Sequence, residues 1–130
     1  MREENYIMYK KLYKHSYASA RSFFETVRVI NSNDVIVAIS CKSYGLRSYN
    51  TDVIRVKNNR LVVTGTYSAT TRKHISWWLN EYGAGLTYQQ IKKCYEDNVA
   101  LDLRIKEYVP LNAEEENYIA TEQHSVRKYW

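Results

Sequence analysis

The sequence has little of what usually marks out a specialised class of protein. Its 130 residues include one proline, four glycines and two cysteines, which excludes collagen-like, low-complexity and disulfide-rich chains. Cys41 and Cys94 fit no zinc-binding or redox spacing, so we expect reduced thiols. No apolar run approaches the about 20 residues of a membrane span, and Met1-Arg2-Glu3-Glu4 does not begin a signal peptide. These absences predict a soluble, cytoplasmic protein without a membrane partner.

What the sequence does contain is typical of one folded domain. Hydrophobic residues make up 45% and charged residues 25% of the chain, which is ordinary for a globular protein. No repeat or flexible linker interrupts it, so we predict a single domain over residues 1–130. Within it we expect a polar N-terminal segment over 1–20, a core over 22–107, and a C-terminal arm over 112–130 that is acidic and then basic.

The charges are divided along the chain. Residues 42–73 carry seven basic side chains and one acidic one, whereas residues 96–122 carry eight acidic and two basic side chains. A basic segment of this kind attracts anionic partners such as nucleic acid or an acidic protein surface. Two interpretations stay open at this point. The acidic stretch either lies against the basic one and neutralises it, or serves as a decoy surface for a basic channel in a partner.

Hydrophobic patterning predicts an α+β fold. Tyr6, Tyr9 and Tyr13 recur at helical spacing, which favours an N-terminal helix. Alternating and β-branched runs predict strands, and the apolar run 35–39 indicates a central, buried one. We expect a mostly antiparallel sheet of about four to five strands packed against one or two helices. The predicted strands lie near residues 24–30, 35–40, 52–57, 60–65 and 100–107, and the predicted helices span residues 69–82 and 88–97.

A tight hairpin is predicted around Asn58 and Asn59. Asparagine tolerates a positive φ, so this pair can form a two-residue turn. The resulting register gathers four apolar residues on the face toward the core: Ile54, Val56, Leu61 and Val63. The opposite, outward face carries three basic residues: Arg55, Lys57 and Arg60. An anionic partner would relieve the repulsion between Lys57 and Arg60. Alternatively, the charges only keep an exposed sheet edge soluble.

The helix predicted over 69–82 has two different faces. Ser68 is a suitable N-cap, and the apolar stripe consists of Thr71, Ile75, Trp78, Leu79 and Tyr82. Trp77 lies on the polar face with Arg72 and Lys73, where an exposed indole can stack on a base or anchor a protein contact. Alternatively, the residues after this helix fold back and cover the indole. The following helix also suggests a helix-turn-helix, although the preceding strands suit an α+β domain better.

Nothing in the sequence indicates catalysis. His15, His74 and His124 are scattered and match no metal-binding motif, and no glycine-rich phosphate loop is present. We therefore predict neither a metal nor a cofactor. The expected role of His74 is to orient the hydroxyls that begin its own helix. A small enzyme using Cys41 or Cys94 with a histidine is the alternative, but we expect both thiols to be buried.

Three motifs in residues 22–83 resemble a known group of proteins. They are Ser22-Phe23-Phe24, Ser48-Tyr49-Asn50-Thr51-Asp52-Val53 and Tyr67-Ser68-Ala69-Thr70-Thr71-Arg72-Lys73-His74-Ile75. Together they resemble a family of small, mostly uncharacterised proteins of bacteriophages and other mobile elements. The chain departs from that pattern at Trp77-Trp78 and in a longer insert from Ser40 to Arg47. The resemblance implies a mobile-element origin and a location in the bacterial cytoplasm. Small phage proteins often bind nucleic acid or block a host machine, as anti-CRISPR proteins do.

The sequence and the resemblance together predict a non-enzymatic binding protein. We expect it to inhibit a host nucleic-acid-directed defence nuclease, in the manner of anti-CRISPR proteins, by binding the nuclease or its nucleic-acid complex. The alternative is a DNA- or RNA-binding regulator without a protein target. Basic side chains would contact phosphates or an acidic surface, and the indole would stack. The predicted contact residues are Arg47, Arg55, Lys57, Arg60, Arg72, Lys73 and Trp77.

Overall fold

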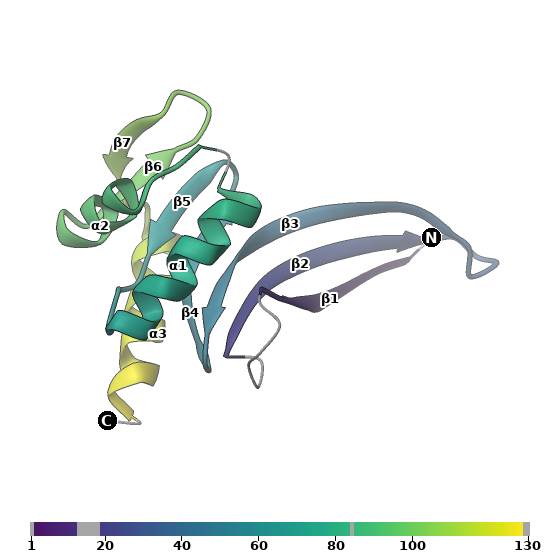
Figure 1. Ribbon diagram of the computed structural model, residues 1–130. Coiled ribbons are helices and arrows are strands. Elements are labelled where there is room, and N and C mark those ends of the chain that lie inside the picture. The colour runs from purple at the N-terminus through teal and green to yellow at the C-terminus, as the bar shows by residue number, and fades with distance from the viewer. Residues whose placement is uncertain (1, 13–18, 84, 129–130) are drawn as a thin grey trace.

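The computed structural model describes residues 2–12, 19–83 and 85–128, with side chains described as far as Gln123. Within these residues, seven strands form one antiparallel sheet in which each strand pairs with the next along the chain, and three helices pack on it (Figure 1). The strands are β1 (Arg2–Lys11), β2 (Ala20–Ile30), β3 (Ile36–Ser48), β4 (Thr51–Lys57), β5 (Arg60–Val63), β6 (Val99–Asp102) and β7 (Glu107–Pro110). The helices are α1 (Ala69–Tyr82), α2 (Tyr88–Glu96) and α3 (Ala113–Lys128).

The α+β class with an antiparallel sheet is confirmed, but the fold is larger than predicted. The sheet has seven strands rather than four to five, and three helices pack on it rather than one or two. The additional elements come from the N-terminal segment, the late strand and the C-terminal segment. Each of these differs from its prediction for a physical reason given below.

The β4–β5 hairpin forms as predicted. Asn58 and Asn59 have φ values of 55° and 61°, the left-handed conformation that this two-residue turn requires and asparagine tolerates. The register places Lys57 opposite Arg60. Because side chains alternate between the two faces of a strand, one face of the hairpin is apolar and the other basic.

Helices α1 and α2 cover the apolar face of the hairpin. α1 begins after Ser68, whose hydroxyl accepts the Thr71 N–H, and α2 begins with a capping box of Thr87 and Gln90. The large, fully buried side chains of this layer each contribute roughly 1.5–3 kcal/mol, so it forms the main core. Its members include Leu46, Ile54, Val56, Leu61, Ile75, Trp78, Ile91 and Leu101.

The basic face of the hairpin does not point outward, because α3 covers it. Val53 and Val62 on this face are 0% and 2% exposed. The side-chain amide of Gln123 in α3 donates to the Thr64 carbonyl at 3.0 Å. The sheet therefore lies between two helical layers, and the prediction of an outward face is wrong. The C-terminal segment, expected as an arm, forms this covering helix.

Strands β1, β2 and the first part of β3 (residues 36–42) form a curved arm, and its outer end extends beyond the rest of the sheet (Figure 1). β4 ends at Lys57, opposite Ser43, so β3 before this point pairs with β2 alone. Val35, Ile36, Val37 and Ile39 are between 44% and 59% exposed. Residues 35–40 do contain a strand, but the prediction that it is buried is wrong, because this part projects beyond the helical layers.

The N-terminal segment is a strand rather than the predicted helix. All ten residues of β1 pair with β2. The Arg28 guanidinium lies 4.8 Å from the centre of the Tyr6 ring, and that of Arg21 lies 4.8 Å from the centre of the Tyr9 ring. Strand pairing and these cation–π contacts outweigh a weak helical pattern. Tyr13, the third residue of that pattern, lies outside the described residues.

The strand predicted over 100–107 is instead a hairpin of two short strands. The Asp102 carboxylate accepts the Arg104 N–H at 2.9 Å, and its carbonyl accepts the Lys106 N–H at 2.7 Å. Lys106 has a φ of 55°, which completes the reversal. Pro110 ends β7 at the edge of the sheet, where its missing N–H removes no ladder hydrogen bond.

Candidate binding site on helix α1

Internal ion pairs occupy most of the basic residues in segment 42–73. Five of the seven pair with acidic side chains: Lys42 with Glu25, Arg47 with Asp52, Arg55 and Lys57 with Glu114, and Arg60 with Glu115. Arg72 and Lys73, both exposed on α1, make no ion pair with any residue that the structure describes. These two are therefore the cations of the segment that remain available to a partner.

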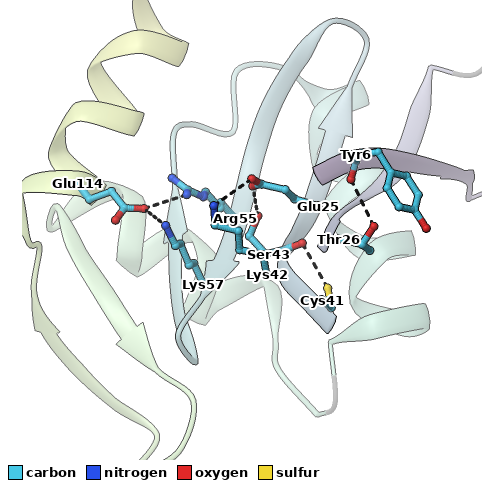
Figure 2. A network of polar contacts seen from close by, with 9 residues as sticks. All are labelled: Tyr6, Glu25, Thr26, Cys41, Lys42, Ser43, Arg55, Lys57 and Glu114. Atoms are coloured by element: carbon cyan, nitrogen blue, oxygen red, sulfur yellow. Dashed lines mark hydrogen bonds and ion pairs between the residues drawn. The ribbon is translucent and has the colours of Figure 1, made fainter. Parts of the chain in front are cut away.

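The start of α3 neutralises part of the hairpin directly. Figure 2 shows the Glu114 carboxylate accepting hydrogen bonds from Lys57 Nζ at 2.6 Å and from Arg55 Nη2 at 3.0 Å. The hydrogen bond from Lys57, together with the charges of both cations, holds the pKa of Glu114 below its usual value. In the same view Glu25 of the arm accepts a hydrogen bond from Ser43. The contacts of Glu114 support the interpretation that the acidic stretch lies against the basic one and neutralises it.

Arg60 makes more hydrogen bonds to the C-terminal part of the chain than Arg55 or Lys57 does. Its Nε and Nη2 donate to the two carboxylate oxygens of Glu115 at 2.9 and 2.8 Å, and Nη2 also donates to the Pro110 carbonyl at 2.7 Å. The hydrogen bond to Glu115 raises the pKa of Arg60. The cavity between the hairpin and the start of α3 measures about 20 Å³, which suits a single water molecule. This cavity has no room for a nucleotide.

The outer side of α1 is hollowed where it meets α2. This open space measures about 630 Å³, and we call it the α1 hollow; it is lined by Ala69, Arg72, Lys73, Ser76, Trp77 and Tyr88. Trp77 is half-buried. The Arg72 guanidinium lies 5.2 Å from the centre of the Tyr88 ring, a cation–π contact that fixes it beside α2. The α1 hollow thus combines two cations with two aromatic side chains.

A row of aromatic rings adjoins the α1 hollow. The His74 ring lies 5.8 Å from that of Trp77, with 29° between their planes, and 5.6 Å from that of Tyr49. Tyr49 is 55% exposed and occupies the turn between β3 and β4 with a φ of 54°. His74 is fully buried and its Nδ1 lies 2.8 Å from Ser48 Oγ. Desolvation lowers the pKa of His74, so this ring is neutral at pH 7.

The described residues include no activated nucleophile. Ser48 and His74 have the separation of a nucleophile and its base, but they are 4% and 0% exposed, so a substrate cannot reach the hydroxyl. Burial raises the pKa of Cys94 to about 12. Cys41 is exposed because it lies on the arm, contrary to the prediction that both thiols are buried. Partial desolvation, with the charge of Glu25, still raises the pKa of Cys41, so neither thiol is a ready thiolate.

Other surfaces of the molecule offer less. A mostly apolar cavity of about 260 Å³ lies between α1 and the β6–β7 turn, with Lys106 as its one charged lining residue. In the ranges covered by the structure, no three His, Cys, Asp or Glu side chains come close enough together to bind a metal ion. None of the described helices combines the length and the apolar composition needed to cross a membrane.

The structure brings together three of the seven predicted contact residues: Arg72, Lys73 and Trp77. The other four lie at the hairpin and the β3–β4 turn, in ion pairs: Arg47, Arg55, Lys57 and Arg60. Sequence reasoning missed Tyr88 and Tyr49. Tyr88 directly follows the capping residue Thr87, so its position at the start of α2 could have been predicted from the sequence. Tyr49 had none, because only the fold places its ring against α1.

Comparison with known proteins yields one match. No curated protein and no solved structure matches this chain. One family model matches residues 10–94, which include every residue of the α1 hollow as well as Ser48, Tyr49 and His74. The match leaves out most of β1 and all of α3. Since it covers well over half of the sequence, the chain belongs to the family of unknown function DUF8033.

Proposed function

We propose that this protein is a non-enzymatic binding protein that contacts single-stranded nucleic acid through the α1 hollow, with the strand either free or held by a host nuclease. One observation carries the proposal: the two basic residues of segment 42–73 that lack an acidic partner in the described structure line the same hollow as Trp77. A strand needs cations for its phosphates and an accessible aromatic ring for its bases. The α1 hollow supplies both.

The arrangement of side chains suits a flexible strand. Lys73 lies one helical turn before Trp77, so its ammonium can reach the phosphate beside a base that stacks on the indole. Arg72, already positioned by Tyr88, presents a planar guanidinium that can donate to two phosphate oxygens at once. The volume of about 630 Å³ falls within the usual range of ligand sites.

Inhibition of a defence nuclease stays a prediction within this proposal; the resemblance to phage proteins implies a mobile-element origin and not a mechanism. Contact between the α1 hollow and a nucleic acid strand would also account for inhibition, because an inhibitor bound to the guide or target strand prevents base pairing of that strand. The basic face of the β4–β5 hairpin does not take part in this contact, since Arg55, Lys57 and Arg60 already donate to carboxylates of α3.

Fluorescence anisotropy with labelled single-stranded RNA and DNA over a salt series tests the proposal. Two phosphate contacts predict a log K that falls with log salt at a slope of about −1.4. Trp77→Ala should weaken binding at least about fivefold through lost stacking, and Lys73→Ala should reduce the slope by about 0.7. Arg104→Ala removes a cation that is 68% exposed in the β6–β7 turn, and this matched control should bind like the parent chain.

The proposal would be contradicted by no binding of either strand at low salt, or by unchanged binding after Trp77→Ala. A duplex that competes as well as a single strand would also contradict it, because paired bases cannot stack on the indole. If free strands bind and the chain also inhibits an RNA-guided nuclease, loss of inhibition with Trp77→Ala assigns both effects to the α1 hollow.

A further inference from the structure

Strand β1 leaves a long edge of the sheet open. Its ten residues pair with β2 on one side, and no other described strand pairs with it (Figure 1). Eight of the ten are exposed, and the strand is about 33 Å long at the usual rise per residue. An open edge of this length presents unpaired N–H and C=O groups that can pair with another strand.

The charges along β1 are ordered so that the strand complements itself. Glu3 and Glu4 stand near its start and Lys10 and Lys11 at its end, on either side of Ile7. If two copies of β1 pair antiparallel about Ile7, Glu3 faces Lys11 of the second copy. Glu4, which also accepts a hydrogen bond from Arg28 of its own chain at 3.0 Å, faces Lys10 of the second copy. Each dimer then contains four pairs of opposite charge. Parallel pairing sets like charges opposite each other, which is unfavourable.

The apolar residues of β1 fit the same register. Ile7 faces Ile7 of the second copy, and Tyr6 faces its Met8, so apolar side chains meet across the junction. Ile7, Met8 and Tyr9 are 55%, 44% and 46% exposed in the single chain, and pairing would cover them. A register shifted by one residue toward the N-terminus instead sets Arg2 against Lys11, a repulsive pair.

We propose that β1 is a dimerisation strand, through which two copies of this chain pair antiparallel about Ile7 into one continuous sheet. The order of charges selects a second copy of the chain as the partner, because any other strand would need the same acidic-to-basic order. Antiparallel pairing relates the copies by a two-fold axis perpendicular to the sheet, so both α1 helices lie on one side. This inference does not rest on the proposed function.

Sedimentation analysis of the full chain over a concentration series tests the proposal. The parent chain should reach a monomer–dimer equilibrium that weakens as salt is added. Lys11→Glu turns two attractive pairs of the dimer into repulsive ones and should raise the dimer dissociation constant about tenfold or more. Because Lys11 makes no ion pair with a described residue, the Lys11→Glu chain should melt at the same temperature as the parent chain at concentrations where both are monomeric. Arg104→Glu makes the same charge change outside the arm and should leave the equilibrium as it was.

Compensating changes separate pairing from a general effect of charge. The double variant Glu3→Lys with Lys11→Glu restores opposite charges and should recover the dimer. A mixture of the Glu3→Lys chain and the Lys11→Glu chain should form heterodimers in preference to either homodimer.

Four results would overturn the proposal, and the first three concern β1 itself. They are a monomer at every concentration in low salt, a dimer that Lys11→Glu leaves intact, and a double variant that stays monomeric although correctly folded. A dimer that dissociates only after Ile39→Lys would place the interface on β3 of the arm instead and would equally refute pairing through β1.

Discussion

Glu115 is the residue on which attachment of α3 most depends, and Glu115→Ala should destabilise the fold strongly. Its carboxylate accepts hydrogen bonds from Nε and Nη2 of Arg60 at 2.9 and 2.8 Å, and the side chains of Glu115 and Arg60 are only 11% and 23% exposed. The same carboxylate accepts the Asn112 N–H at 2.9 Å while the Asn112 side chain accepts the Glu115 N–H at 2.8 Å. One carboxylate thus closes a capping box and binds the sheet.

The expected magnitude follows from these contacts. A bidentate, mostly buried pair of charged groups is worth about 2 kcal/mol, and a helix cap about 1 kcal/mol. Glu115→Ala should therefore lower the free energy of unfolding by about 3 kcal/mol. For a chain of this length that corresponds to a fall in Tm of about 12 °C. Urea denaturation at pH 7, followed by circular dichroism, measures the change.

A double-mutant cycle isolates the contact with Arg60. Arg60→Ala and Glu115→Ala should show a coupling energy of about 2 kcal/mol, because each substitution removes the same two hydrogen bonds. Glu116→Ala is the matched control: it removes an exposed acidic side chain from the same turn and should cost about 0.5 kcal/mol or less. A coupling below about 0.5 kcal/mol, or equal losses for Glu115→Ala and Glu116→Ala, would refute the reasoning.

Three further predictions concern other parts of the chain. Trp78→Ala, at a side chain 1% exposed, should cost about 4 kcal/mol in urea denaturation, whereas Trp77→Ala should cost about 1 kcal/mol; equal losses would contradict the assigned faces of α1. Burial and a neighbouring carboxylate raise the pKa of Glu122 above 4.5, so its charge destabilises the fold at pH 7, and Glu122→Gln should raise Tm and make stability less pH-dependent between about pH 4.5 and 7. Maleimide should label Cys41 in the native protein but label Cys94 only after unfolding, as mass spectrometry would show.

The parts of the fold that the sequence predicted well are those set by local chemistry. The β4–β5 register follows from one dipeptide, Asn58-Asn59, and two alternating runs. The start of α1 follows from Ser68, the side chain that caps this helix. In each case the residues that determine the structure lie within a few positions of one another, so the local sequence pattern is enough to predict the conformation.

The arm shows where local patterns fail. The run at residues 35–39 has the composition of a buried strand. Burial, however, depends on whether a helix covers the strand, and the helical layers do not reach these residues. Strand β1 owes its conformation to pairing with β2 across a sequence separation that no spacing within residues 2–11 reveals. The hairpin at 99–110 likewise depends on a contact that the alternating sequence pattern does not reveal, in which the Asp102 carboxylate accepts the Arg104 N–H.

Prediction of the candidate site was limited in the same way, because composition does not show where the fold places each side chain. The sequence identified the basic residues of segment 42–73, but whether a cation is available to a partner depends on where the carboxylates lie. Arg55, Lys57 and Arg60 meet their partners in α3 at separations of 59, 57 and 55 residues, which no periodicity encodes. Once these pairs and the ion pairs of Lys42 and Arg47 are set aside, Arg72 and Lys73 remain beside the indole of Trp77. These remaining cations, rather than the total charge, define the surface on which we propose that nucleic acid binds.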